Sequence, residues 1–359
     1  MDKKIKIAII SYYSGILDRG VETFVQEITK RLSKKIDITV FQAGNRKYNE
    51  NQVKVKVIKT FATNSKSSKG IFRKFYLDWQ SIKILLFTLK VLPFILKGKY
   101  DFVIPTNGGW QTALCRIITK ITKAKMIVTG HAGIGSDDAW NLLFRPDIFV
   151  SLTGAQNSWA KKLAPEVKVT RIPNGVDLSK FNPKVKEKKL DLQKPIVICT
   201  SALDPYKRVD LTIKAVAKTK NLSLLILGNG GEKGKIDSLG KRLLGNRFLR
   251  LVVPYDQIPE YYRAAKVFTL ASKTEAFGIA YLEALASGLP VVTTNDKSRQ
   301  EIIGIAGILT NPEDVDQYAK DLSIAVKSDY QKRALSQARK FTWETVAKKY
   351  LSLIEGPKN

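Results

Sequence analysis

The sequence predicts an α/β protein made of two doubly wound domains, each with a parallel sheet covered by helices. Short runs rich in aliphatic and β-branched residues alternate with stretches of helical spacing, and this alternation stops once and then restarts. The chain of 359 residues, 44% of them hydrophobic and 26% charged, is long enough to bury two cores. We therefore expect two βα modules of similar size.

The first module is predicted over residues 1–172. The lysines before its first strand resemble the start of a signal peptide, but the alternating isoleucines indicate a buried strand, and no small-residue cleavage site follows. Apolar residues at helical spacing follow that strand: Val21, Phe24, Val25, Ile28 and Leu32. Strands are predicted at KIAIIS, IDITVF, VKVKVI, YDFVIP, KMIVTG, DIFVSL and KVTRIP.

Residues 173–194 are polar, contain proline and lack core periodicity, which predicts a linker. The second module follows over residues 195–340, with strands expected at IVICTS, LSLLILG, FLRLVV, KVFTLA and PVVTT. Parallel sheets of this kind bind ligands at the carboxyl ends of their strands. Two such domains facing each other are expected to enclose a cleft lined by loops from both.

The charge of the chain predicts an anionic partner. Lys and Arg number 61 against 32 Asp and Glu, a formal net charge of +29. A diphosphate substrate, an anionic membrane surface and nucleic acid all fit, although no nucleic-acid-binding module is found, and we expect no nucleic acid. Cys115 and Cys199 stand far apart in apolar settings, which argues against a disulfide or thiolate metal site. A cytoplasmic location is expected.

Residues 70–97 depart from the alternating pattern because they are aromatic and apolar yet contain five Lys and Arg residues. Lys83, Lys90 and Pro93 divide the segment into runs shorter than the ~20 residues that a membrane crossing needs. Two interpretations stay open. One is an amphipathic helix on the inner face of the plasma membrane, with lysines toward anionic lipid. The other is a core helix whose lysines extend to solvent.

The stretch SKTEAFGIAYLEALASGLPVVTT contains the pattern most informative about chemistry. Gly278 precedes an apolar periodic run, and Gly288 with Pro290 closes it, which predicts a helix over residues 279–287. The first N–H groups of such a helix have no partner within it and form a site for phosphate.

Two carboxylates flank that predicted phosphate site. Glu283, on the second turn, can reach ribose hydroxyls, and Glu275, in the loop before the helix, can accept hydrogen bonds from a sugar. A capping carboxylate and a solvated helix glutamate are the alternative interpretation. The predicted phosphate donors are the backbone N–H groups of Phe277, Gly278, Ile279 and Ala280.

A second constellation lies in SALDPYKRVDLTIKA, where a strand ends at Ser201 and a helix begins near Lys207. Lys207 and Arg208 therefore stand at a strand carboxyl end, where two cations can neutralise a leaving diphosphate without a metal ion. In a chain so rich in lysine and arginine, solvated surface residues are the alternative. A metal-dependent transferase needs a DxD after a strand, whereas Asp314 and Asp316 indicate the start of a late helix.

These motifs together resemble the GT4 family of glycosyltransferases. EAFGIAYLEALASGLPVV resembles its E-x7-E signature, and RIPNGVDLSKF, PYKRVDLTIKA, GVETFVQEI and FTWETVAKKYLSLIE resemble neighbouring motifs. The resemblance covers nearly the whole chain. It implies a GT-B fold with two Rossmann-like domains, retention at the anomeric carbon, no required metal or other cofactor, and a last helix, residues 341–359, that crosses back to the N-terminal domain.

The resemblance also implies roles for individual residues. Glu275 contacts the donor sugar, Glu283 the ribose and Lys207 the diphosphate. His131, in TGHAG after a strand, resembles the family histidine that faces the donor sugar, with a satisfied structural histidine as the alternative. Gly20 resembles the glycine of the first βα loop, where bare backbone approaches phosphate.

Three positions depart from the family pattern. The usual arginine near position 202 is Ala202, so that Arg208 is the candidate to supply its charge. The usual glycine pair of the first loop is reduced to Gly20 preceded by Arg19, and Ala276 replaces the glycine after the first glutamate. These departures bear on donor affinity and identity more than on the class of reaction.

The expected reaction is transfer of a glycosyl group from a UDP- or GDP-sugar to a hydroxyl of a glycan or a lipid-linked acceptor. A sugar-nucleotide epimerase of the same fold is the alternative. Val253, Pro254 and Tyr255 are expected to contact the base of the donor. Asn107 and Gly108, in NGGWQ after a strand, are candidates for the acceptor side.

Overall fold

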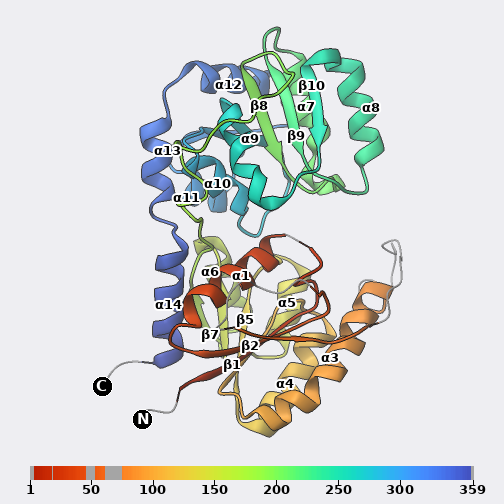
Figure 1. The fold of residues 1–359 in the computed structure, drawn as a ribbon, viewed down its shortest axis with the longest axis vertical. Helices are drawn as coiled ribbons and strands as arrows, with labels where there is room; N and C mark the ends of the chain where they lie inside the picture. The colour runs from red at the N-terminus through yellow and green to blue at the C-terminus, as the bar shows by residue number, and fades with distance from the viewer. Residues whose placement is uncertain (1–3, 18, 46–52, 61–74, 357–359) are drawn as a thin grey trace. The chain divides into compact units, whose positions relative to one another are not determined.

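The protein forms two compact units, which a computed structural model describes over residues 4–17, 19–45, 53–60 and 75–356 (Figure 1). Unit 1 comprises Met1–Pro173 together with Val346–Asn359, and unit 2 comprises Asn174–Thr345. The chain therefore passes from one unit to the other twice. Residues 174–194, within the predicted linker, belong to unit 2, where Val176 pairs with Thr342 in a parallel bridge.

Unit 1 is built on a seven-stranded sheet in the order β3-β2-β1-β4-β5-β6-β7, with every pair of neighbouring strands parallel. The strands are rich in Ile and Val because a parallel sheet is buried on both faces. They are β1 (Lys6–Ser11), β2 (Asp37–Gln42), β3 (Lys54–Val57), β4 (Phe102–Pro105), β5 (Lys125–Thr129), β6 (Ile148–Ser151) and β7 (Lys168–Arg171).

Helices cover both faces of this sheet, with α3 and α4 below it and α1 above it in Figure 1. Phe87 and Val91 of α3 join Cys115 of α4 in the core under the sheet. Phe24 of α1 meets Tyr350 of the last helix, with ring centroids 5.6 Å apart. The helices are α1 (Gly20–Leu32), α3 (Trp79–Gly98), α4 (Trp110–Thr122), α5 (Ser136–Leu143), α6 (Gly154–Leu163) and, from Val346 onward, α14 (Trp343–Glu355).

Unit 2 is built on a six-stranded sheet in the order β10-β9-β8-β11-β12-β13, again with parallel neighbours. Its strands are β8 (Ile196–Thr200), β9 (Ser223–Leu227), β10 (Phe248–Leu251), β11 (Val267–Leu270), β12 (Val291–Thr294) and β13 (Gly307–Thr310). Its helices are α7 (Val209–Ala217), α8 (Lys233–Leu244), α9 (Ile258–Ala264), α10 (Ile279–Ala286), α11 (Lys297–Ile303), α12 (Val315–Lys327) and α13 (Gln331–Ala338), with 3-10 turns η1 (Pro205–Lys207), η2 (Gly245–Arg247) and η3 (Tyr255–Gln257).

The two doubly wound α/β sheets confirm the predicted fold class. The helix predicted over residues 279–287 is α10, and its preceding residue Gly278 has a φ of 84°. Asp314 caps α12 by accepting a hydrogen bond from the Gln317 N–H, which confirms that the DxD begins a late helix. Both cysteines are free and buried.

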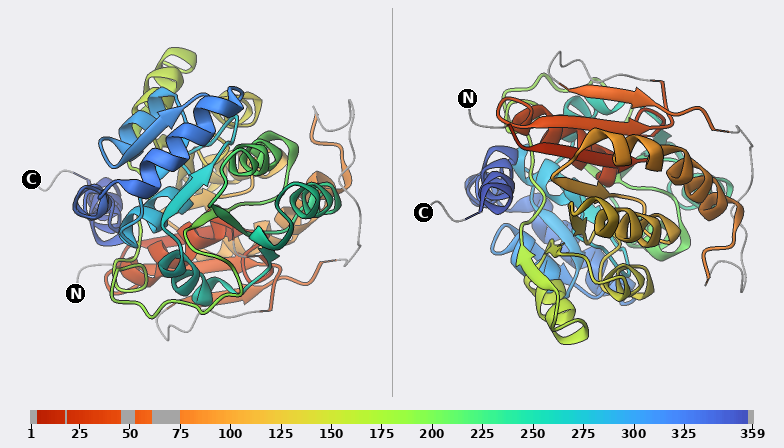
Figure 2. Two further views of the ribbon diagram at one scale, coloured as in Figure 1. Left: turned by 90° about the horizontal axis from the view of Figure 1, so that it is seen from above. Right: turned by 90° about the horizontal axis from the view of Figure 1, so that it is seen from below.

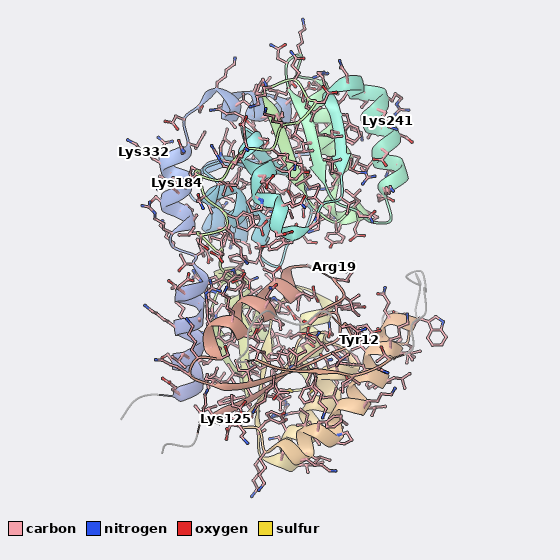
Figure 3. The ribbon with its side chains drawn as sticks, viewed as in Figure 1. Tyr12, Arg19, Lys125, Lys184, Lys241 and Lys332 are labelled. Atoms are coloured by element: carbon pink, nitrogen blue, oxygen red, sulfur yellow. The ribbon has the colours of Figure 1, made fainter. Side chains whose placement is uncertain are left out.

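Lysines are distributed over both units. Figure 3 shows Lys125 of unit 1 and Lys184, Lys241 and Lys332 of unit 2 on separate parts of the surface. The positive charge is thus spread over many elements. Net charge alone therefore does not locate an anion site, which depends on local contacts.

The basic and apolar segment 70–97 largely forms α3, although Ile71, Phe72, Arg73 and Lys74 lie outside the described residues. One face of α3 is buried through Phe87, Val91 and Ile95, as the core-helix interpretation requires. The opposite face is apolar and exposed: Trp79 is 60% exposed, Leu86 43%, Leu89 44% and Leu96 49%. No helix of the described chain is long and apolar enough to span a membrane.

Candidate active site

The candidate site of unit 2 lies where the strand order reverses. β9 and β10 extend the sheet to one side of β8, whereas β11, β12 and β13 extend it to the other. The chain leaves β8 toward β9 and leaves β11 toward β12, so the loops after β8 and β11 lie at the switch point on the carboxyl edge, the usual ligand position in an open α/β sheet. Lys207 follows β8 and Glu275 follows β11.

Lys207 and Glu275 meet at this reversal. The Lys207 Nζ donates to the Glu275 Oε1 over 2.6 Å, and both side chains are largely buried, 14% and 11% exposed. Burial lowers the pKa of Lys207, but the Glu275 carboxylate outweighs it and holds that pKa above its usual value. Lys207 is therefore a cation at neutral pH, and the pair places a fixed positive and a fixed negative group side by side.

The loop that carries Glu275 is held by side chains from within unit 2. The Ser272 hydroxyl donates to the same Glu275 Oε1 over 2.7 Å. Arg299, 1% exposed, donates to the Ser272 carbonyl over 2.8 Å and to the Tyr281 hydroxyl over 3.1 Å, and it also pairs with Asp296. Because Arg299 is buried behind the loop, its contacts keep the position of Glu275 fixed.

Glu283 is buried and bound by two tyrosines. The Tyr255 hydroxyl donates to one carboxylate oxygen over 2.6 Å, and the Tyr262 hydroxyl donates to the other over 3.2 Å. Burial raises the pKa of Glu283 to about 7, although these two hydrogen bonds lower it. Glu283 thus lies beside Tyr255, which is expected from the sequence to contact the base of the donor. Tyr262 was missed because a tyrosine within an amphipathic helix gives no sequence signal of such a contact.

The Arg208 side chain does not join the Lys207–Glu275 pair and binds other acceptors. Arg208 has a φ of 48°, and its guanidinium donates to the Ala271 carbonyl over 2.7 Å, to Glu313 over 2.8 Å and to the Thr294 hydroxyl over 3.3 Å. Arg208 therefore links the segments after β8, β11 and β13 with the last residue of β12, and three acceptors already hold its guanidinium.

The start of α10 offers backbone donors beside Glu275. Gly278 precedes the helix in the left-handed region, and a Cβ there would meet the Tyr281 ring at 2.4 Å. Only glycine is therefore accommodated. Phe277 is buried, whereas Ile279 begins the helix with an N–H that has no partner within it. Val253 and Pro254 stand in the segment between β10 and η3.

In unit 1 the strand order reverses between β1 and β4. Asn107 follows β4, and its side-chain oxygen accepts from the Tyr12 N–H, just after β1, over 2.7 Å. Gly108, with a φ of 67°, lies against the Asn141 side chain. Gly20 is the exposed first residue of α1 and follows Arg19. Asn107 and Gly108 thus lie at the carboxyl edge.

His131 follows β5 at the same edge of unit 1. Its ring lies 4.7 Å from the Phe24 ring, centroid to centroid, and its buried Nε2 has no hydrogen-bond partner in the described chain. Burial lowers the pKa of His131 to about 3, so the imidazole is neutral at pH 7. A neutral ring with a free nitrogen can exchange a hydrogen bond with a sugar hydroxyl but contributes no positive charge.

Asp138, which the sequence did not single out, holds the loop that follows His131. This buried carboxylate accepts from the Gly133 N–H over 2.9 Å and from the side-chain amides of Asn141 and Gln156, each over 3.0 Å. Burial raises the pKa of Asp138 to about 7, and the hydrogen bonds lower it. Within the described residues, no group of three or more His, Cys, Asp or Glu side chains is placed to hold a metal ion.

A known protein family is similar to the part of the chain that carries these residues. Residues 181–341, which include Lys207, Glu275 and Glu283, match the family described as Glycosyl transferases group 1. The matched stretch lies within unit 2. The group 1 domain thus contains the E-x7-E stretch and the lysine that pairs with its first glutamate.

Two curated relatives are glycosyltransferases by name. The O-antigen chain mannosyltransferase B of Escherichia coli is 37% identical over 97 residues, 26% of this chain and 26% of its own. The GDP-mannose-dependent monoacylated alpha-(1-6)-phosphatidylinositol monomannoside mannosyltransferase of Corynebacterium glutamicum is 25% identical over 210 residues, 51% of this chain and 55% of its own. The chain thus matches about a quarter of the first relative and about half of the second.

The fold likeness extends beyond the group 1 domain. HepE of Anabaena, solved in complex with UDP and glucose, superposes with a TM-score of 0.77 at 18% sequence identity, over 98% of this chain and 99% of that one. The likeness confirms the GT-B fold that the sequence motifs imply.

Proposed function

We propose that this protein is a retaining glycosyltransferase that moves a glycosyl group from a nucleotide sugar to a hydroxyl of a glycan or lipid-linked acceptor. The observation that carries the proposal is the Lys207–Glu275 pair at the strand reversal of the group 1 domain. A cation there suits a diphosphate, and a carboxylate there suits the hydroxyls of a sugar. The names of the relatives support the same class of reaction.

In the proposed reaction the bond between the anomeric carbon and the diphosphate oxygen breaks, and its electron pair leaves with the diphosphate. The acceptor oxygen forms the new bond on the same face, and its proton passes to the leaving phosphate. Charge grows on that phosphate, and Lys207 with the N-terminal N–H groups of α10 stabilises it. Glu275 orients the donor sugar and Glu283 the ribose. His131, neutral at pH 7, hydrogen-bonds the sugar.

The donor nucleotide is UDP or GDP. Tyr255 supports a base and ribose site near Glu283, because its hydroxyl binds that carboxylate while its backbone belongs to the segment after β10. HepE was solved with UDP, and the Corynebacterium relative is named for GDP-mannose, so the relatives support both nucleotides. Asn107 and Gly108 are proposed to border the acceptor, which suits their place at the carboxyl edge of unit 1.

A donor screen with the purified protein tests this function. Incubation with UDP- and GDP-sugars and a panel of hydroxyl acceptors should release the nucleoside diphosphate and form a glycoside, and EDTA should leave the rate unchanged. Formation of an epimeric nucleotide sugar without acceptor would support the epimerase instead. Complete loss in EDTA with recovery in Mg²⁺ or Mn²⁺ would show that the transfer depends on a metal ion.

We also propose that α3 brings the enzyme to the anionic inner face of the plasma membrane. Its exposed face carries Trp79 and Leu86 together with Lys90 and Lys97, and the half-buried Lys83 lies beside them. A helix with apolar and basic residues on one exposed face suits a lipid interface. Its neighbour α4 adds exposed apolar side chains beside Lys120 and Lys123, namely Ile117 and Ile121, 60% and 64% exposed.

A variant with Lys83→Glu and Leu86→Ser tests the membrane proposal. Its affinity for vesicles containing acidic lipid should fall at least about tenfold, because each cation near the surface contributes on the order of 1 kcal/mol. Cosedimentation measures the effect, which should shrink as salt is raised. Lys241→Glu on α8 is the matched control and should bind like the parent. Equal binding of the parent to neutral and acidic vesicles would contradict an electrostatic membrane contact.

A further inference from the structure

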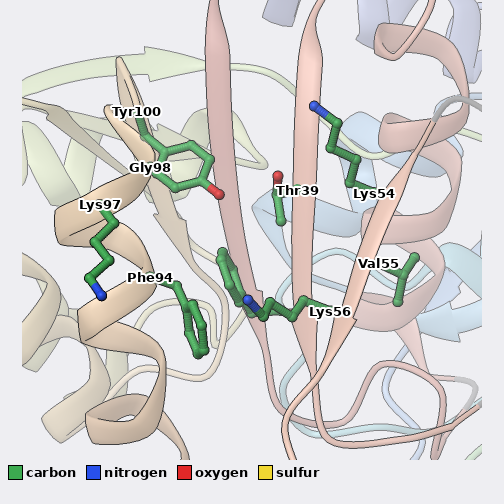
Figure 4. A pocket seen from close by; sticks show the side chains of 9 residues that line it. Thr39, Lys54, Val55, Lys56, Phe94, Lys97, Gly98 and Tyr100 are labelled. Atoms are coloured by element: carbon green, nitrogen blue, oxygen red, sulfur yellow. The ribbon is translucent and has the colours of Figure 1, made fainter.

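A pocket of about 400 Å³ lies at the amino edge of unit 1, between the β2–β3 side of the sheet and the end of α3 (Figure 4). Lys54 opens β3, and Tyr100 immediately precedes β4. Both positions are at the opposite end of the sheet from Asn107 and His131, which follow their strands. The pocket is therefore separate from the carboxyl edge of unit 1, where the acceptor side is proposed.

The base of the pocket is aromatic. The Phe41 and Phe94 rings stack with centroids 6.1 Å apart, and Tyr100 meets Phe41 edge-on at 6.3 Å. The ammonium group of Lys56 lies 3.3 Å from the centroid of the Phe94 ring. This contact holds the Lys56 side chain against the pocket, as Figure 4 shows, where a free lysine would extend into solvent.

The polar groups around this base are mainly donors without partners. Lys54 is neutralised by Asp37, whose two oxygens lie 2.9 Å from its Nζ. Across the described chain, Lys56 and Lys97 have no carboxylate partner. The Thr39 and Tyr100 hydroxyls likewise make no hydrogen bond to the described residues. Two cations and two hydroxyls thus line one pocket, and no acidic side chain is among its lining residues.

We propose that this pocket binds a phosphate monoester. A phosphate group carries about −1.5 to −2 charges at pH 7 and three strong acceptor oxygens, which suits several donors better than the two oxygens of a carboxylate. The organic part of the ligand packs on the Phe94 and Phe41 rings, which supply the apolar wall. Two sources carry this chemistry: a lipid headgroup, since Phe94 and Lys97 belong to α3, and a soluble phosphate ester.

Two binding measurements on the full chain distinguish these sources. Calorimetric titration with glycerol 3-phosphate tests the soluble ester. Cosedimentation with phosphatidylcholine vesicles containing phosphatidic acid, against vesicles with phosphatidylglycerol of matched surface charge, tests the lipid monoester. Binding to glycerol 3-phosphate, or a preference for phosphatidic acid over phosphatidylglycerol, supports the pocket, and the measurement that shows it identifies the source. Absence of both overturns the proposal.

Substitutions of pocket residues test whether the phosphate ligand binds in this pocket. Lys56→Met keeps the stem on Phe94 but removes the charge, and it should weaken phosphate binding about tenfold, the usual effect of losing one charge-assisted bond. Lys56→Arg should retain binding, and Thr39→Val should weaken it less. Lys125→Met, at the exposed start of β5, is the matched control for loss of charge. If Lys56→Met binds the phosphate ligand as tightly as the parent does, the pocket is not the site. The same conclusion follows if Lys125→Met loses as much affinity as Lys56→Met.

The pocket is independent of the proposed glycosyl transfer. Lys56→Met should hydrolyse or transfer a soluble donor at the parental rate, because none of the pocket residues belongs to the candidate active site. A chain that binds phosphate without transferring sugar would contradict the proposed function and leave the pocket standing. Thermal unfolding of each variant shows whether the fold has been kept.

Discussion

We expect Glu275→Gln to lower kcat/KM for glycosyl transfer on the order of a hundredfold, the usual effect of removing one charged or polar contact to a reacting group. Glutamine keeps the shape of the side chain but removes the charge that accepts hydrogen bonds from Lys207 and Ser272. The donor sugar would lose its fixed acceptor. Steady-state kinetics with the donor found in the screen measure the change.

The control for this prediction is affinity for the nucleoside diphosphate alone. Glu275→Gln should bind it at least as well as the parent, because Lys207 no longer has a carboxylate partner and remains close to the phosphate position. Glu313→Gln is a matched variant, since Glu313 is another glutamate of unit 2 that pairs with a cation, Arg208, and its side chain is 69% exposed. Parental turnover by Glu275→Gln would remove Glu275 from the donor site.

Lys207→Ala should weaken binding of the nucleoside diphosphate between about ten- and a hundredfold, since a hydrogen bond to a charged group contributes roughly 1.5–3 kcal/mol. The variant removes a cation that is held protonated by Glu275 and lies after β8 at the strand reversal. Calorimetry with UDP and GDP measures the loss, which should be smaller for the nucleoside without phosphates.

Arg208→Ala separates the two neighbouring cations. Its guanidinium links the Ala271 carbonyl, Thr294 and Glu313, so the variant should lower the unfolding temperature and change diphosphate affinity less than Lys207→Ala does. If Arg208→Ala instead loses the greater share of affinity, Arg208 supplies the charge absent at Ala202. Equal affinity in both variants and the parent would remove the diphosphate assignment.

The helices and strands near the candidate site were predictable because their apolar residues recur with the spacing of the element that they form. Gly278 and Gly288 bound α10 by their backbone freedom, and the aliphatic runs of β8 and β11 mark buried parallel strands. β13 was missed because it has only four residues, begins with Gly307 and holds just two aliphatic residues, Ile308 and Leu309. α5 was missed because it is short and its first turn contains Asp137 and Asp138, which do not suggest a buried face.

Contacts between distant side chains were not predictable. Lys207 and Glu275 were placed in one site from separate motifs, but their ion pair depends on the loops after β8 and β11 meeting, which the local sequence does not encode. The sequence did not indicate that Arg299 is buried, because in a chain this rich in lysine and arginine each such residue is expected to lie in solvent. The Tyr255 and Tyr262 bonds to Glu283 join three segments, and only the packed unit brings them together.

The division of the chain between the two units has a consequence for its synthesis. Unit 2 is one continuous stretch, whereas unit 1 needs residues from both ends of the chain, because the Tyr350 hydroxyl bonds Thr129 over 2.9 Å and its ring packs on Phe24. As the ribosome delivers the chain from the N-terminus, unit 2 has its full set of residues before unit 1 does. The unit that is made first is therefore completed last, and the contacts of Tyr350 with Thr129 and Phe24 form only after α14 has emerged.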